Sequence, residues 1–191
     1  MSPPSRTGAE TFEAMYQIDR DPWNFANDPY ERSRYAAVLA ALPAGRFEFG
    51  FEPGCSVGEL AVLVAPRCNR YLAIDIAPTA VATARARCRH LPQVQVQTAA
   101  LPVAIPPRGI DLLVFSEIGY YFDEPELASI IEQLRGRLVG RAVVVACHWL
   151  GSSSDHVLSG DRVHELLNDT LGTPANGWRA RDYRIDLWTS T

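Results

Sequence analysis

The sequence has 191 residues, of which 47% are hydrophobic and 21% charged, and its formal net charge is −4 at pH 7; these values are typical of a globular protein of one domain. The acidic balance argues against a nucleic-acid partner, and we expect no membrane span or signal peptide because no apolar run is long enough. All 18 basic residues are arginine, which excludes P-loop, kinase and pyridoxal chemistry, since each needs a lysine.

The cysteines and histidines give no sign of a metal centre. The four cysteines are far apart and form no paired motif, so neither a disulfide framework nor a zinc site is predicted. His156 and His164 have no third ligand near them, and we expect both on the surface and no bound metal. Free cysteines are typical of a reducing cytoplasm, which is the expected location.

The N-terminal quarter is predicted to be mainly helical. Residues 9–18 have amphipathic spacing, and Asp28 precedes a proline at the start of a helix that continues to Leu42. Trp23 lies in the loop between these helices and is either part of a hydrophobic plug or an aromatic face near a bound cation. Arg32 and Arg34 are candidates to bind a carboxylate, although arginines on helix surfaces are more often solvated.

The stretch 47–60 has the pattern of a strand, a glycine turn and a helix. Its phenylalanines alternate as strand residues do, and its last residues begin a helical repeat. Glu52, Gly54, Cys55 and Gly58 lie between the two. A glycine turn that opens a helix directs N–H groups outward at the positive end of the helix dipole. We therefore expect this turn to hold a carboxylate or a phosphate.

A second acid indicates which ligand binds there. Asp75 ends the next apolar run, about twenty residues on, where the ribose-binding acid of a nucleotide site is expected. Ser56 stands where the dinucleotide-binding fingerprint has its second glycine, which lets the backbone approach a pyrophosphate. A side chain at this position favours a cofactor whose anionic end is smaller than a pyrophosphate. These features predict S-adenosylmethionine (SAM), with Ile76 flanking the adenine and Ala100 and Leu101 packing on it.

The rest of the chain continues the alternation of strands and helices. The pattern predicts helices at 79–90, at 124–138 (ended by Gly140) and from Ser159 or Gly160, and strands at 94–96, 110–115, 142–147 and 183–188. A further strand is expected between Leu171 and Arg179, where the pattern does not place it.

The predicted fold class is a three-layer α/β sandwich, with a Rossmann-like, mostly parallel sheet and an antiparallel, half-exposed C-terminal edge strand. We interpret residues 1–191 as one domain, in which residues 1–45 form a helical lid and residues 46–191 the core. Ligands of such sheets bind at the carboxyl ends of the strands. Besides the residues above, these ends bring together Ser116, Glu117, Tyr120, Tyr121 and His148.

With these motifs the chain resembles class I SAM-dependent methyltransferases, and more narrowly the nodulation protein S (NodS) family of small N-methyltransferases. The matching pieces occur in the family's order and are residues 21–23, 28–32, 51–58, 74–75 and 116–121. Residues 148–149 and 158–161 also look like bacterial relatives found beside or fused to sugar deacetylases. Two departures are the lack of an acid at residues 98–100 and a short C-terminal part.

The resemblance implies a cofactor, an acceptor and partners. The cofactor-binding residues are expected to be Trp23, Arg32, Glu52, Gly54, Cys55, Ser56, Gly58, Asp75, Ile76, Ala100, Leu101, Ser116 and Glu117. The acceptor would be a small molecule or an oligosaccharide, with the amine of a deacetylated amino sugar as its reactive group, and S-adenosylhomocysteine (SAH) would be the product. A sugar deacetylase or a glycosyltransferase of the same pathway is the implied partner.

The catalytic residues are predicted from their positions at the strand tips. A neutral amine attacks the methyl group, so Glu117 and His148 are expected to accept its proton, with Tyr120 and Tyr121 orienting the acceptor. His148 is equally compatible with a packed histidine beside Trp149, and Glu117 with a ligand of acceptor hydroxyls.

Two other functions remain open at this stage. One is an NAD(P)-dependent oxidoreductase or epimerase, against which Ser56 and the missing lysines count. The other is a non-catalytic subunit with the same fold, which would bind SAH without turnover. Titration with SAM and NADH distinguishes the first from a methyltransferase.

Overall fold

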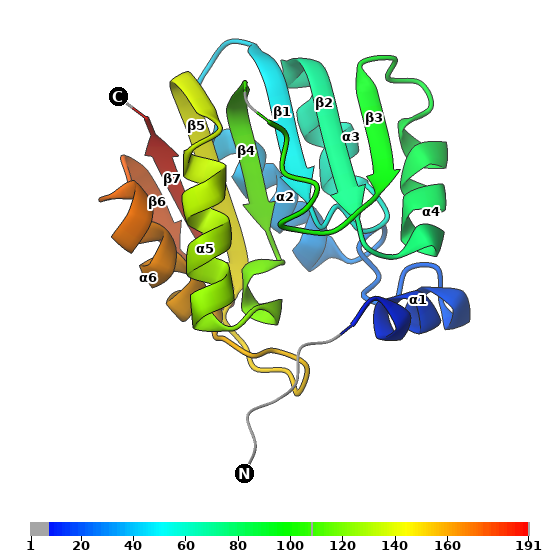
Figure 1. Cartoon of the computed structure of the whole chain (residues 1–191). Helices are drawn as coiled ribbons and strands as arrows, with labels where there is room; N and C mark the ends of the chain where they lie inside the picture. Colours follow the sequence, from blue (N-terminus) through cyan, green and yellow to red (C-terminus); the bar gives the residue numbers. More distant parts are fainter. Residues whose placement is uncertain (1–7, 108, 191) are drawn as a thin grey trace.

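The computed structural model describes residues 8–107 and 109–190, which form one α/β domain (Figure 1). The strands are β1 (Phe47–Pro53), β2 (Cys68–Asp75), β3 (Val94–Thr98), β4 (Ile110–Ser116), β5 (Leu138–Trp149), β6 (Asn176–Arg179) and β7 (Tyr183–Thr189). The α-helices are α1 (Ala9–Ile18), α2 (Pro29–Ala41), α3 (Glu59–Val64), α4 (Pro78–Cys88), α5 (Glu124–Arg135) and α6 (Gly160–Leu171). Two short 3₁₀ helices are η1 (Ala65–Arg67) and η2 (Gly119–Tyr121).

The seven strands form a single sheet in the order β3-β2-β1-β4-β5-β7-β6. The first five in this order are parallel, and β7 is antiparallel to both β5 and β6. Apolar residues of α2, α3 and α4 pack on one face of the sheet, and those of α5 and α6 pack on the other. The predicted three-layer sandwich with a mostly parallel sheet is therefore confirmed.

The C-terminal strands differ from the prediction in their exposure. β7 is not the edge strand, because β6 pairs with its outer side. Asp186 and Trp188, which were expected to face solvent, are only 5% and 2% exposed because α6 covers that face. β6 falls within the window predicted for the missing strand; its four residues are all exposed, so it leaves no hydrophobic pattern in the sequence.

Two helical predictions also need correction. α5 ends at Arg135 rather than near Gly140, and Leu138 already pairs with Ile110 of β4. Leu138 lies four residues after Leu134 and so extends the helical repeat although it belongs to a strand. In addition, β3 leads to β4 without a helix among the described residues 99–107, so not every parallel strand is followed by a helix.

The parallel strands place their carboxyl ends at one edge of the sheet, the lower edge in Figure 1. α1 lies beyond this edge and is attached to α4, because the Glu13 carboxylate accepts hydrogen bonds from Thr79 N (3.0 Å) and Thr79 Oγ1 (2.6 Å). α2 packs on the core through buried Tyr35 and Val38. The N-terminal segment thus contacts the core next to the carboxyl ends of the strands, and the ligand was expected to bind at these ends.

Gly58 shows how tightly α3 and α4 pack. It has φ +81° and ψ 20° at the start of α3, and a Cβ atom there would lie 2.9 Å from the Cβ of Ala84 on α4. Side chains rarely adopt this left-handed conformation, and there is no room for one. Gly58 therefore permits a close helix contact and does not line the cavity described below, contrary to the prediction for this residue.

Substitution of Gly58 should cost stability through both effects. Gly140 also has a positive φ, of +59°, but has open space around it. We expect Gly140→Ala to lower the free energy of unfolding by about 1 kcal/mol from backbone strain alone, and Gly58→Ala to lower it by about 2–4 kcal/mol because overpacking adds to the strain. Urea unfolding of both variants measures the difference, and equal losses would contradict the packing argument.

Candidate active site

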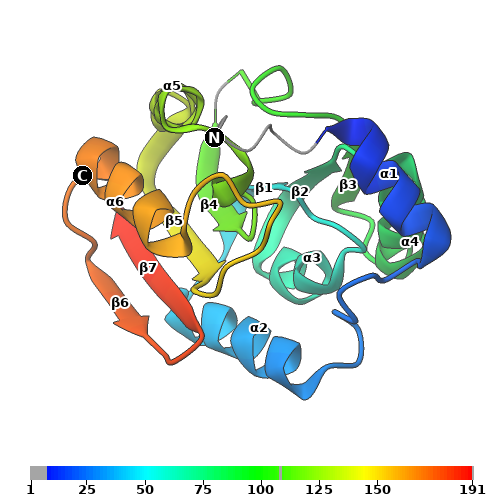
Figure 2. The same ribbon diagram turned by 90° about the horizontal axis from the view of Figure 1, so that it is seen from below.

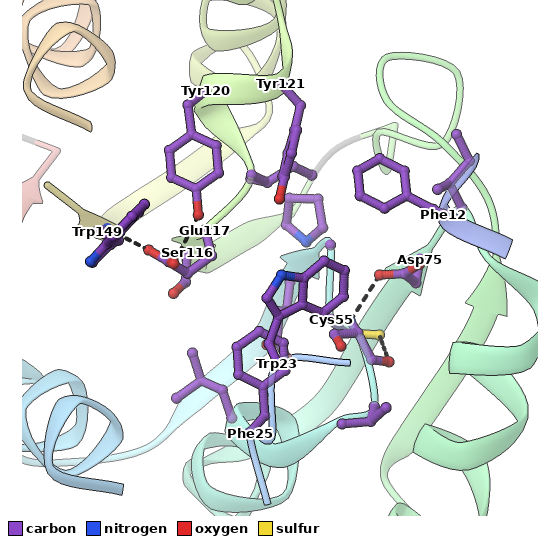
Figure 3. A pocket seen from close by; sticks show the side chains of 18 of the residues that line it. Phe12, Trp23, Phe25, Cys55, Asp75, Ser116, Glu117, Tyr120, Tyr121 and Trp149 are labelled. Atoms are coloured by element: carbon purple, nitrogen blue, oxygen red, sulfur yellow. Dashed lines mark hydrogen bonds between the residues drawn. The ribbon is translucent and has the colours of Figure 1, made fainter. Parts of the chain in front are cut away.

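A cavity of about 420 Å³ lies at the carboxyl ends of the parallel strands, a volume within the range of small-molecule sites. Its walls come from the ends of β1, β2, β4 and β5, from η2, and from α1, α2 and the loops that follow α1 and β5 (Figure 3). The predicted site residues that line it are Trp23, Glu52, Gly54, Cys55, Ser56, Asp75, Ile76, Ala100, Leu101, Ser116, Glu117, Tyr120 and Tyr121. Arg32, Gly58 and His148 do not.

Asp75 is held in place by backbone N–H groups. Its Oδ2 accepts from Ser56 N at 2.8 Å and its Oδ1 from Ala77 N at 2.9 Å. The side chain is largely buried, and burial raises the pKa of the carboxyl group although both hydrogen bonds lower it. Each oxygen keeps a lone pair for a further donor. A fixed carboxylate is thus available to ligand hydroxyls at the end of β2.

The glycine turn does not present the free N–H groups that the sequence led us to expect. Gly54 N and Cys55 N both donate to Ile74 O, at 2.8 and 2.9 Å, so the turn is tied to β2. Gly54 instead provides space, because its φ is +74° and a Cβ atom would lie 2.8 Å from Cδ1 of Ile118. An anionic ligand group therefore needs another partner.

Arg34 is a candidate for that partner; the sequence suggested it together with Arg32, but it was not included in the predicted cofactor-binding set. Its side chain is 1% exposed, lines the cavity, and forms ion pairs with Glu31 and, at 2.9 Å from Nη1 to Oε1, with Glu117. Arg32, the arginine included in the predicted set, is exposed and donates to Ala26 O at 3.4 Å. Both arginines follow an acid at helical spacing, Asp28 before Arg32 and Glu31 before Arg34, so this spacing does not distinguish them.

Glu117 is bound by several groups at once. Besides Arg34, its Oε1 accepts from Trp149 N at 2.6 Å, and its Oε2 accepts from the Tyr120 hydroxyl at 2.8 Å (Figure 3). The residue has φ +56°, an unusual backbone conformation for glutamate. Glu117 thus joins α2, β4, β5 and η2 at the base of the cavity.

His148 lies behind the cavity rather than in it. It is fully buried; its Nε2 accepts from Gly119 N at 3.2 Å, and its Nδ1 lies 3.2 Å from Nε2 of His164. Nδ1 of His164 is in turn 2.8 Å from Asp186 Oδ2. Burial lowers the pKa of both imidazoles, so both are neutral. Of the two roles left open for His148, the structure supports the packed histidine and not the base, and the surface position predicted for His164 is wrong.

Aromatic side chains from the N-terminal segment cover the cavity. The Tyr16 hydroxyl and Ser56 Oγ are 2.5 Å apart, and the Trp23 ring contacts the rings of Tyr16 and Phe25 at 5.5 and 5.6 Å. In Figure 3, Trp23 enters the cavity from the side opposite Tyr121. α1 and the loop after it thus contribute aromatic side chains to the wall of the cavity.

Sequence analysis missed the loop between β5 and α6. Ser152, Ser153, Asp155 and His156 of this loop all line the cavity. His156 was expected on the surface; its position just after the strand tip at Trp149 was the available signal. Among the described residues no group of three potential ligands is placed to bind a metal ion, and no described helix has the length and apolarity to cross a bilayer.

Comparison with known proteins identifies the family. The profile of the family "Nodulation protein S (NodS)" matches residues 12–172. The chain belongs to this family. Nodulation protein S of Sinorhizobium fredii is 27% identical over 160 residues, which cover 79% of this chain and 72% of that protein. The predicted family and the predicted class of enzyme, a methyltransferase, are thereby confirmed.

Two solved structures agree with this assignment. A putative methyltransferase from Pseudomonas syringae is 35% identical, with a TM-score of 0.75 and coverage of 84% of this chain and 99% of that one. The N-methyltransferase NodS from Bradyrhizobium japonicum WM9, solved with SAH, has a TM-score of 0.84 at 22% identity and covers 96% of this chain and 98% of its own. The NodS structure shows that the whole fold is shared.

Glu52 supplies a test of the electrostatics at the base of the cavity. Its side chain is 3% exposed and Oε2 accepts from the Tyr71 hydroxyl at 2.8 Å. Burial raises the pKa of Glu52 to about 8. The carboxyl group is therefore mainly protonated at neutral pH in the folded protein, but ionised in the unfolded chain.

This difference makes stability depend on pH. The folded state binds the Glu52 proton more tightly than the unfolded chain does. The stability that this proton binding contributes is therefore lost as the pH rises from about 4.5 to about 8. Glu52→Gln removes this loss. The difference in unfolding free energy between variant and wild type should therefore grow with pH by up to roughly 1 kcal/mol per unit. Urea unfolding at several pH values measures it, Glu48→Gln on the exposed part of β1 is the control, and a flat difference would contradict the interpretation.

Proposed function

We propose that this protein transfers the methyl group of SAM to the amine of a deacetylated amino sugar or of a short oligosaccharide that carries one. The proposal rests chiefly on one observation: a fixed carboxylate, Asp75, and a buried cation, Arg34, line the same cavity as the glycine turn. Those are the groups that the sugar and the amino-acid end of SAM require. Family membership supplies the methyltransferase activity.

The residues present fit SAM. Asp75 would accept hydrogen bonds from the ribose hydroxyls, and Ile76 and Leu101 would flank the adenine. Arg34 would pair with the methionine carboxylate. The N–H groups of the glycine turn would not, because Gly54 N and Cys55 N already donate to Ile74 O. Trp23 offers an aromatic face to a cation at the same cavity. When bound, SAM supplies a methyl group that its sulfonium has already activated.

The chain's own contribution is alignment and exclusion of water. Glu117 holds the Tyr120 hydroxyl, so one wall of the acceptor side is fixed before the acceptor arrives. In this proposal residues 1–45 act as the lid, because Tyr16 and Trp23 lie over the turn at Ser56. Closing that lid would remove water from the reacting groups.

An amino-sugar acceptor is supported by the chemistry of the other side of the cavity. Trp149 and Tyr121 provide aromatic faces, Ser152 and Ser153 provide hydroxyls, and Asp155 provides a carboxylate. Aromatic rings and a carboxylate suit an ammonium group, and hydroxyls suit sugar hydroxyls. The related NodS structure is that of an N-methyltransferase, which favours nitrogen as the methylated atom.

An amino-sugar acceptor also indicates which enzymes act in the same pathway and in which compartment. A free amine on an amino sugar arises by deacetylation, so a sugar deacetylase would supply the substrate, and a glycosyltransferase of the same pathway would act beside it. We place the reaction in the cytoplasm, in keeping with four cysteines that are all free and buried.

A transfer assay with radiolabelled SAM tests the proposal. Glucosamine and deacetylated chitooligosaccharides should acquire label, whereas their N-acetylated forms should not, because an amide nitrogen is a poor nucleophile. Label in neither set, with tight SAH binding, would instead indicate a non-catalytic member of the fold.

Asp75 tests the cofactor half of the site. Loss of two hydrogen bonds to a charged group should weaken SAM binding at least about 100-fold in Asp75→Ala. Asp169→Ala, an exposed acid on α6, is the matched control. Calorimetry measures the affinity and thermal unfolding verifies the fold, since Asp75 also holds Ser56 N. Undiminished affinity would refute the role of Asp75.

A further inference from the structure

We infer that His156 is the general base of the methyl transfer, taking the proton that the acceptor ammonium loses before it attacks. The inference rests on the proposed function and assigns a catalytic role to a residue outside the family motifs used above. The geometry of the loop between β5 and α6 carries it; this loop passes across the end of β4 (Figure 2).

The two bases expected from the sequence are already committed to other partners. Both oxygens of Glu117 accept hydrogen bonds, and Arg34 pairs with its charge. Both nitrogens of His148 are within hydrogen-bond distance of groups in the core. Protonation of either side chain would break contacts that hold the strand ends together. A base must instead be able to change its protonation state without this cost.

His156 meets this requirement. Its side chain lines the cavity and is 9% exposed, and its Nδ1 is buried with no hydrogen-bond partner among the described residues. Nε2 lies 4.0 Å from Oδ1 of Asp155. The carboxylate favours a hydrogen on Nε2, which leaves the lone pair on Nδ1 to accept a proton.

The electrostatic surroundings favour a neutral imidazole that can become charged. Burial lowers the pKa of His156, while the carboxylates of Asp155 and Glu117 oppose that change. The phenol rings of Tyr120 and Tyr121 also face it, and both phenols are uncharged because burial raises their pKa values. The free imidazole is therefore neutral at physiological pH, and a nearby carboxylate stabilises the imidazolium once it forms.

The position of His156 is fixed by stacking and by the backbone. Its ring stacks on Tyr120 with centroids 3.7 Å apart and planes at 17°, and Tyr121 and Trp149 contact it edge-on. Val157 N and Leu158 N both donate to Tyr120 O, at 2.8 and 3.1 Å. The loop is thus bound to η2, so the imidazole keeps its place at the acceptor side.

The proton and the electrons balance in this scheme. The acceptor R–NH₃⁺ gives one proton to Nδ1 of His156 and becomes R–NH₂. The lone pair of that nitrogen forms the bond to the methyl carbon as the carbon–sulfur bond breaks, and the sulfur keeps the bonding pair. The products are R–NH₂⁺–CH₃ and SAH, and His156 later returns its proton to water.

Two variants of His156 test the inference, with deacetylated chitooligosaccharide as the acceptor. His156→Phe keeps a ring to stack on Tyr120 but has no base, and kcat at neutral pH should fall about 100-fold or more. The loss should shrink as the pH rises, because more of the acceptor amine is then neutral. Added imidazole should restore part of the activity of His156→Ala.

Controls separate base catalysis from packing. SAH affinity by calorimetry should stay within about twofold in His156→Phe, and His90→Phe, at an exposed position after α4, should leave kcat unchanged. Retention of kcat within about threefold by His156→Phe, or a change in KM alone, would overturn the inference. If the wild type transfers no label to any amine, the proposed function fails, and that result is known before any variant is made.

Discussion

The ion pair between Arg34 and Glu117 is the contact on which the site depends. It joins α2 to the carboxyl end of β4 in a place where Arg34 is almost completely buried. Burying a charge is costly unless it is paired, and removal of one partner from a buried pair costs about 3–5 kcal/mol. The pair therefore ties the N-terminal segment to the sheet.

Two halves of the cavity meet at this pair. Arg34 lines the cavity together with Glu52 and Asp75, the acids of β1 and β2, and Glu117 binds the Tyr120 hydroxyl and Trp149 N. From behind, the chain of His148, His164 and Asp186 supports Gly119 N and so η2. Such buried polar networks favour one arrangement of the backbone over near alternatives. The part of the cavity wall that η2 forms is therefore held in place by the core.

Much of this could be predicted from the sequence, because the deciding patterns are local. The strand, turn and helix around Gly54 and the acid at Asp75 follow from alternation and spacing, and both lie where expected. Arg32 and Arg34 could not be separated in this way. They are about 200° apart around a helix, so one faces inward and the other outward, and which does so depends on Glu117, a residue far away in the sequence.

The histidines show a different limit. Strand position correctly placed His148 near the site, but whether a side chain is free to react depends on how many of its polar atoms already have partners. Both nitrogens of His148 are within hydrogen-bond distance of core groups, whereas the loop residue His156 lines the cavity and has a buried Nδ1 with no hydrogen-bond partner among the described residues. Strand ends are held by neighbouring strands and helices, so their polar groups tend to be used for structure. Polar groups on loops are more often left without such partners, and catalytic and binding residues are found disproportionately on loops. An unpaired buried atom is costly for folding, and its retention beside a cavity is best explained by a partner that arrives with the substrate.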